Sequence, residues 1–255
     1  MKPTRRRKLR TPEFPHPLRH PGPPGWHFFG GKPMTLSDRL EACISYVNQN
    51  DRVADIGCDH GLLGIALLER GIARSVIAAD VGEGPLSAAK ANAQRHGLAG
   101  KMTFFLSDGV ENIPRDFDTL VCAGMGGDTM IHILSSAPWL NDDRHRLILQ
   151  CQSKRPELRR WLYEHDYAIS RETLAQDGKF LYTVMEVRPG NINFTPLDTY
   201  LSPALRECGS PLLRPFCTRL LEGLSKSAAG LSHRGERDVE LEAVLAELTE
   251  FKETL

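Results

Sequence analysis

Apolar residues in the middle of the chain alternate between short unbroken runs and longer segments with spaced apolar positions. Short unbroken runs predict buried strands, and apolar positions three or four residues apart predict helices. The expected strands are residues 53–56, 75–81, 102–106, 119–123, 146–150, 167–174 and 180–187. The expected helices are residues 36–47, 62–68, 85–96, a segment from about 128, and 156–165. Thr35 and Asp38 are placed to form a capping box on the first helix, and Gly71 is placed to end the second.

The order of these elements predicts an α/β fold with a seven-stranded sheet. Five strand-then-helix units require parallel pairing with right-handed crossovers. The last two strands are joined by a turn at residues 176–179, which predicts an antiparallel hairpin at one edge of the sheet. The first helix, the sheet and its covering helices are expected to form one domain over residues 34–190.

Residues 191–255 form a separate helical section with two apolar stripes, which predict an antiparallel helical hairpin. The stripes are Leu213, Cys217, Leu220, Leu224 and Leu231, then Leu241, Val244, Leu248, Phe251 and Leu255. Basic residues favour the side of this hairpin nearer its turn. Two interpretations remain open: the hairpin grips an RNA, or it serves in packing or dimerisation.

The net charge of zero hides an uneven distribution along the 255 residues. Residues 1–33 carry eight basic residues and one acidic residue, a net charge of +7, so the remainder carries −7. The same segment holds 8 of the 17 prolines and no apolar periodicity, so we expect it to be disordered. It is either a basic arm for nucleic acid or an inert tail, and Met34 is a third option as the true start of translation.

Other composition features narrow the class of protein. No apolar run approaches the roughly 18 residues of a membrane helix, so we expect no membrane association. The six cysteines are scattered, without a C-x-x-C pair, which favours reduced thiols in the cytoplasm and no metal site.

Glycine and aspartate gather where the first three predicted strands end. In a parallel sheet these carboxyl ends meet at one edge, where ligands bind. The first strand runs into a loop whose glycines let a ligand approach the backbone, the second ends in an aspartate able to accept hydrogen bonds from ribose hydroxyls, and the third ends where adenine would lie. Together they predict a site for an adenosyl ligand. Its residues are Asp55, Gly57, Asp59, Gly61, Asp80, Val81, Asp108 and Gly109.

Two adenosyl ligands compete for this site. A dinucleotide requires Gly-x-Gly-x-x-Gly, but the glycines here are Gly57, Gly61 and Gly64, and Asp59 would repel a pyrophosphate. A sulfonium cation is favoured beside carboxylates, so S-adenosyl-L-methionine fits better. A plain helix entry is the structural alternative for the first loop alone.

Several motifs resemble those of the bacterial tRNA methyltransferases that modify N1 of adenine 22. They are Leu36-Ser37-Asp38-Arg39-Leu40, Ala54-Asp55-Ile56-Gly57-Cys58-Asp59-His60, Gly84-Pro85, Asp108-Gly109, Ala123-Gly124-Met125-Gly126-Gly127, Leu147-Ile148-Leu149-Gln150, Arg159-Arg160-Trp161-Leu162-Tyr163 and Asp177-Gly178-Lys179. The resemblance implies a class I, Rossmann-like methyltransferase domain, S-adenosyl-L-methionine as cofactor, tRNA as partner and a C-terminal helical appendage. It places Gly124 and Met125 beside the cofactor. The chain departs from the family at Gln150-Cys151-Gln152-Ser153, where a Gln-Pro-Asn-like turn is usual, and at Gln176, where the family has an acidic residue.

The chemistry of such a transfer needs no strong base, because N1 of adenine has an in-plane lone pair that is largely unprotonated at neutral pH. Catalysis would come from alignment and exclusion of water. Gly126 and Gly127 offer bare backbone to the target base, with Gln150 nearby. Asp59 and His60 are the first candidates to contact the reacting group. The alternative is that Asp59 caps the following helix and His60 packs beside the cofactor.

A basic cluster after the fifth strand is the candidate contact for RNA phosphates. It consists of Lys154, Arg155, Arg159 and Arg160. The alternative is a solvated helix face paired with Glu157 and Glu164. The leading function is therefore tRNA adenine-N1 methylation by a monomer or weak dimer. The alternatives are a methyltransferase for a small molecule or protein, and a non-catalytic RNA-binding protein, against which the cofactor motifs argue.

Overall fold

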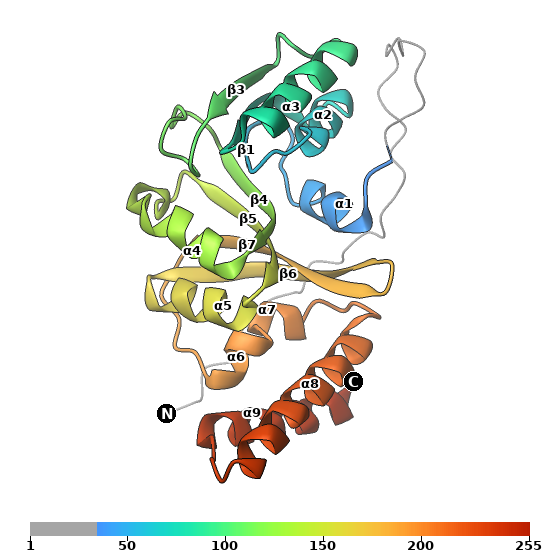
Figure 1. Ribbon diagram of the computed structural model, residues 1–255, viewed down its shortest axis with the longest axis vertical. Coiled ribbons are helices and arrows are strands. Elements are labelled where there is room, and N and C mark those ends of the chain that lie inside the picture. The colour runs from blue at the N-terminus through green and yellow to red at the C-terminus, as the bar shows by residue number, and fades with distance from the viewer. Residues whose placement is uncertain (1–34) are drawn as a thin grey trace, which may run out of the picture. The chain divides into compact units, whose positions relative to one another are not determined.

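The computed structural model describes residues 35–255, which belong to one compact unit built around a seven-stranded sheet (Figure 1). The strand order is β3-β2-β1-β4-β5-β7-β6. The strands are β1 (Asp51–Ile56), β2 (Ala73–Asp80), β3 (Met102–Leu106), β4 (Thr119–Gly126), β5 (Arg146–Ser153), β6 (Tyr167–Asp177) and β7 (Phe180–Pro189). Strands β1 to β5 pair in parallel, whereas β7 runs antiparallel to both β5 and β6. The predicted parallel sheet with an antiparallel hairpin at one edge is confirmed.

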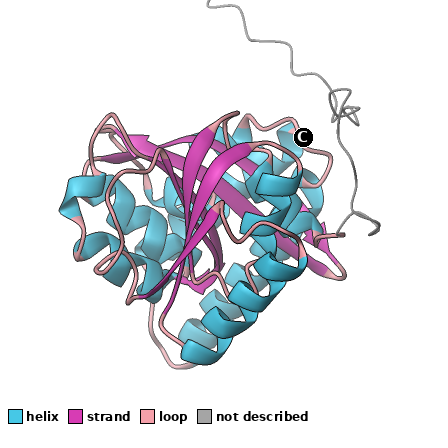
Figure 2. Ribbon diagram, turned by 90° about the horizontal axis from the view of Figure 1, so that it is seen from above, coloured by secondary structure: helices cyan, strands magenta, loops and turns pink. Residues whose placement is uncertain are grey.

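Helices cover both faces of the sheet (Figure 2). They are α1 (Asp38–Ile44), α2 (Leu62–Glu69), α3 (Glu83–Arg95), α4 (Gly127–Ser135) and α5 (Arg155–Glu164), with a short 3-10 helix, η1, at Pro138–Leu140. Because successive strand residues point to opposite faces, Val53 joins the core under α1, α2 and α3, and Ala54 joins the core under α4 and α5. Burial on both faces explains why the strands read as unbroken apolar runs.

The C-terminal section adds four helices and a third apolar core. They are α6 (Pro196–Tyr200), α7 (Pro203–Arg206), α8 (Leu213–His233) and α9 (Val239–Thr254). Helices α8 and α9 form the predicted hairpin, and their residues Cys217 and Leu248 are fully buried. Leu174 of β6 joins the same core, so the hairpin is anchored to the edge of the sheet.

Four local expectations are corrected by the structure. The N-cap of α1 is Ser37 and carries no side-chain cap bond, so the capping box of Thr35 and Asp38 does not form. The segment at residues 107–118, between β3 and β4, contains no helix, so one of the five expected units lacks it. Strand β4 continues through Gly126, and α6 and α7 were not anticipated.

Two further expectations concern membrane-spanning helices and the N-terminal residues. No helix between residues 35 and 255 is long and apolar enough to cross a membrane. The expectations for residues 1–33 and for Met34 lie outside the described residues.

Candidate functional site

The first glycine-rich loop lies at the carboxyl end of β1 and holds its backbone in a conformation that favours glycine. Gly57 has φ +69°, and a Cβ there would lie 2.2 Å from Cε of Met125, which extends β4. Gly124 has φ +85° and faces Arg39. A side chain at Gly57 would therefore collide with Met125, and one at Gly124 would crowd Arg39, so glycine at both positions lets the ends of β1 and β4 pack closely against their neighbours.

Asp80 at the end of β2 organises this loop. Its Oδ2 accepts a hydrogen bond of 3.0 Å from the backbone N–H of Asp59, and its Oδ1 accepts one of 2.9 Å from Gly82. The carboxylate is therefore fixed between two loops while remaining partly exposed. Its remaining lone pairs can accept hydrogen bonds from a pair of hydroxyl groups.

An apolar surface continues from Asp80 across the ends of two adjacent strands. Val81 follows β2 and is 69% exposed, and Leu106, which pairs with Asp80 in the sheet register, is 47% exposed. Two exposed large apolar residues at adjacent strand ends suit a flat aromatic ligand such as adenine. Asp108 lies two residues beyond Leu106, 3.6 Å from His132. Leu106 is not among the residues predicted for the site, because the last residue of an apolar strand is expected to lie in the core.

Asp55 lies beneath the glycine-rich loop and is buried. Burial, reinforced by the negative charge of Asp80, raises the pKa of its carboxyl to about 7, against a hydrogen bond from the backbone of Gly64 that lowers it. Its Oδ2 is buried and has no hydrogen-bond partner among residues 35–255. A buried carboxylate oxygen without a partner is costly, so the carboxylate would be stabilised by a cationic or hydrogen-bonding group that reaches it.

Asp59 and His60 both lie at the surface of the loop. Their side chains are 72% and 57% exposed and approach within 3.6 Å of each other. The N-cap of α2 is Gly61, without a side-chain cap bond, so the alternative that Asp59 caps this helix is wrong. Neither side chain is held in the core, which leaves both free to face a substrate at the carboxyl edge.

Gln150 is fully buried within β5 and fixes the neighbouring loop. Its Oε1 accepts hydrogen bonds from the backbone N–H of Gly124 at 3.0 Å and from Arg39 Nη1 at 3.2 Å. Arg39 also lies 4.0 Å from Asp177 at the tip of the β6–β7 hairpin. Sequence analysis assigned Arg39 no role, although it joins three parts of the site that are distant in sequence.

The four basic residues after β5 do not form one surface cluster. Arg159 is 1% exposed and donates hydrogen bonds to Glu172 and to the carbonyl of Thr199, so the prediction that it contacts RNA is wrong. Lys154 pairs with Asp128 and Arg160 with Glu240, both at the surface. Arg155 is half-buried beside β7. The expected pairing with Glu157 and Glu164 is absent from the ion pairs of residues 35–255.

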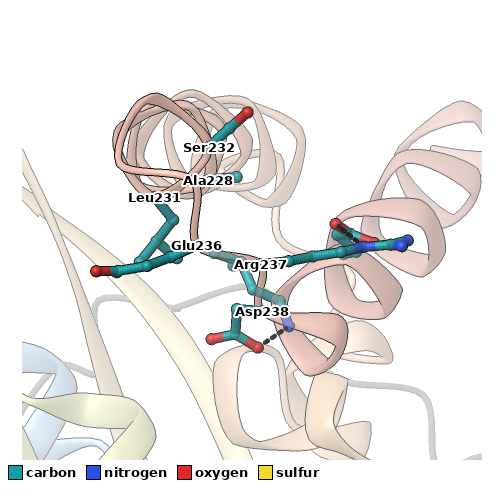
Figure 3. A pocket seen from close by; sticks show the side chains of 9 residues that line it. Ala228, Leu231, Ser232, Glu236, Arg237 and Asp238 are labelled. Carbon is teal, nitrogen blue, oxygen red and sulfur yellow. Dashed lines mark hydrogen bonds and ion pairs between the residues drawn. The ribbon is translucent and has the colours of Figure 1, made fainter.

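A cavity of about 260 Å³ beneath the α8–α9 turn lies away from the strand ends (Figure 3). Arg237 pairs with Glu242 at 2.6 Å, and Asp238 caps α9 by accepting the N–H of Leu241 at 2.9 Å. These polar groups satisfy one another and shape the turn. The cavity therefore adds no residue to the site at the carboxyl edge.

Comparisons with known proteins agree with this geometry. Residues 36–185 match the family described as "Methyltransferase domain". The tRNA (adenine(22)-N(1))-methyltransferase of Bacillus subtilis (strain 168) is 31% identical over 159 residues, which are 62% of this chain and 67% of that protein. Streptococcus pneumoniae Sp1610, solved in complex with S-adenosyl-L-methionine, superposes with a TM-score of 0.76 at 30% identity over 86% of this chain and 100% of that one. The crystal structure of the B. subtilis m1A22 tRNA methyltransferase TrmK gives a TM-score of 0.72 at 26% identity, covering 86% and 96% of the two chains.

Proposed function

The chain belongs to the tRNA (adenine(22)-N(1))-methyltransferase family, and on this premise we propose that it transfers a methyl group from S-adenosyl-L-methionine to N1 of adenine 22 in tRNA. One observation carries the proposal. The carboxyl ends of β1, β2 and β4 lie at one edge of the sheet. They bring together the partly exposed Asp80, the buried Asp55 with its unpartnered oxygen, and the glycine-containing loops at Gly57 and Gly124.

The residues at this edge fit the cofactor part by part. Asp80 is placed to accept hydrogen bonds from the ribose hydroxyls, and Val81 and Leu106 provide an apolar wall for adenine. Asp55 beneath the loop offers negative charge to the cationic end of the ligand. When bound, the cofactor would supply an electrophilic methyl group. The N1 lone pair would form a bond to the methyl carbon as the bond from that carbon to sulfur breaks, so S-adenosyl-homocysteine would be the leaving group.

The target base would enter beside Gly124 and Gly126, which are partly exposed. Gly127 is buried, and a Cβ there would lie 2.5 Å from the carbonyl oxygen of Lys154, so the prediction that Gly127 contacts the base is wrong. Gln150 and Arg39 hold the Gly124 loop in place. Alignment of N1 with the methyl group and exclusion of water supply the catalysis, since N1 needs no deprotonation. Asp59 and His60 would contact the exocyclic amine or stabilise the cationic product.

We also propose that the protein works in the cytoplasm as a monomer or weak dimer. Residues 34–190 would serve as the catalytic domain and residues 191–255 as the RNA-binding appendage. The third apolar core packs α8 and α9 against the β6–β7 hairpin, which supports a fixed position of this appendage near the site.

The test combines two measurements. Titration calorimetry with S-adenosyl-L-methionine should give binding with 1:1 stoichiometry, and labelled cofactor should transfer its methyl group to unmodified tRNA. Binding without transfer to tRNA, but with transfer to a small molecule or a protein, would support the alternative methyltransferases. RNA binding without cofactor binding would support the non-catalytic alternative.

A further inference from the structure

A groove of about 290 Å³ lies between the tip of the β6–β7 hairpin and α8. Phe180 and Leu181 at the start of β7 form one wall, and Phe216, Arg219 and Leu220 of α8 form the other. Arg155, at the start of α5, reaches the floor, where its guanidinium lies 5.5 Å from the ring centroid of Phe216.

The groove lies on the same side of the sheet as the glycine-rich site, where the parallel strands have their carboxyl ends. Strand β7 runs antiparallel to β5 with Leu149 opposite Met185, so the hairpin tip projects past the carboxyl end of β5. Continuing this register places Phe180 opposite Lys154, the residue directly after the end of β5. At the tip, Asp177 lies 4.0 Å from Arg39, whose other contacts fix the Gly124 loop.

The chemistry of the groove is aromatic and cationic. Phe180 is 55% exposed and is the only exposed phenylalanine between residues 35 and 255. Lys179 Nζ lies 5.3 Å from its ring centroid, and Arg219 binds the carbonyl of Lys179 at 2.7 Å. Two arginines and no aspartate or glutamate line the groove. Exposed aromatic rings beside arginines bind single-stranded nucleic acid, through base stacking and phosphate contacts.

We propose that this groove binds an unpaired nucleotide of the substrate RNA that flanks the reacting adenine. Phe180 stacks on its base, while Arg219 and Arg155 contact the adjoining phosphates. N1 of adenine is a Watson–Crick position, so the target must leave its base pair to react, and a groove that holds the adjoining nucleotide would favour this open state. This inference rests on the proposed function for the identity of the RNA, but it makes its own claim about where that RNA binds.

Substitution of Phe180 tests the stacking directly by tRNA binding, measured as fluorescence anisotropy without cofactor. Phe180→Ala and Phe180→Leu should each weaken binding about tenfold, because both remove the stacking ring. Phe180→Tyr keeps a ring of the same shape and should restore wild-type affinity. In turnover assays the two weakened variants should raise KM for tRNA with little change in kcat, and the Kd for S-adenosyl-L-methionine should stay unchanged.

Substitution of Arg219 tests the phosphate contact through salt dependence. Arg219→Ala should lower the slope of log affinity against log salt by about 0.7–0.9, the value for one lost phosphate contact. Arg74→Ala is the matched control, because Arg74 is an exposed arginine at the amino end of β2, on the opposite edge of the sheet. Its slope should equal that of the wild type.

Equal tRNA affinity for wild type, Phe180→Ala and Phe180→Leu would overturn the proposal. So would a change in sedimentation of the free protein on Phe180→Ala, since the groove would then be an interface between copies of the chain. A wild type that binds tRNA but does not methylate it would contradict the proposed function, while the same binding measurements would still decide the role of the groove.

Discussion

Two buried carboxylates, Asp55 of β1 and Glu172 of β6, differ in how completely their oxygens are hydrogen-bonded. At the carboxyl edge, Asp55 has an unpartnered buried oxygen and Asp80 is partly open to solvent. Behind α5, Arg159, Glu172 and Ser202 are buried and bound to one another. Asp55 has bonding capacity left for a ligand, whereas Glu172 has both oxygens engaged, which marks it as structural.

The buried cluster explains how the C-terminal helices are attached. Arg159 of α5 donates to Glu172 of β6 and to the carbonyls of Thr199 and Tyr200 in α6. Ser202, the N-cap of α7, donates to the other oxygen of Glu172. Loss of one partner would leave a buried charge, which costs much more than the intact pair contributes.

The largest effect is therefore expected from Arg159→Ala. It leaves Glu172 buried without its cation, so the free energy of unfolding should fall by about 3–5 kcal/mol. Urea denaturation followed by circular dichroism measures this loss. A paired variant, Arg159→Met with Glu172→Leu, removes both charges and should recover most of the stability. A loss below about 1 kcal/mol in Arg159→Ala would contradict the structural role.

Asp80→Ala should affect ligand binding without a comparable loss of stability. The carboxylate is the proposed acceptor for the ribose hydroxyls, and charge-assisted bonds of this kind contribute about 1.5–3 kcal/mol each. We therefore expect S-adenosyl-L-methionine to bind about 10- to 100-fold more weakly by calorimetry. Asp116→Ala is the control, because Asp116 is an exposed acid paired with Arg52 near the amino end of β1. Equal affinities in the two variants would remove Asp80 from the site.

Asp55→Asn should change the stability of the unliganded protein and its affinity for S-adenosyl-L-methionine in different ways. Burial raises the pKa of Asp55 to about 7 in the folded protein, so its contribution to stability is present below pH 4 and is lost as the pH rises to about 7. The Asn variant should lack this loss, and its melting temperature should exceed that of the wild type by a few degrees at pH 8 but not at pH 4.

The affinity of the protein for its cationic ligand should depend on pH in the opposite direction. Ionised Asp55 favours the cation, so wild-type affinity for S-adenosyl-L-methionine should rise severalfold between pH 5.5 and about 7 and then level off. Calorimetry should find a flatter profile in Asp55→Asn. If affinity depends on pH in the same way in both proteins, ionised Asp55 does not contribute to ligand binding.

The smallest effect is expected from Arg160→Ala. Its pair with Glu240 is exposed, and exposed pairs contribute about 0.2–1 kcal/mol, so urea denaturation should show a loss below 1 kcal/mol. A loss of stability approaching that of Arg159→Ala would show that the exposed Arg160 contributes as much as the buried Arg159.

The fold was largely predictable because strands buried on both faces produce unbroken apolar runs. The extension of β4 through Gly124 and Gly126 was not, since glycines after an apolar run indicate a turn. Arg159 was misassigned because a charged residue on a helix carries no sign of its partner, Glu172, which approaches from another element. Arg39 was overlooked for a similar reason: its partner Gln150 is 111 residues away.

The positions of Asp55, Asp59 and Asp80 at the ends of β1 and β2 were predictable, because each belongs to a local motif in which a strand runs into a loop. Its apolar wall and its connection to the hairpin tip depend on strand register, which places Leu106 beside Asp80 and Phe180 beyond β5. Register is set by tertiary pairing and has no local pattern, so these residues emerge only from the structure.

The central claim is tested most directly by mapping the methylated nucleoside. Unmodified tRNA is incubated with the protein and S-adenosyl-L-methionine, and the product is digested for mass spectrometry and copied by reverse transcriptase. We predict N1-methyladenosine and a stop at position 22, because a methyl group on N1 blocks Watson–Crick pairing. A tRNA with guanine in place of adenine 22 should remain unmethylated. Methylation of that variant, or N6-methyladenosine without a stop, would contradict the account.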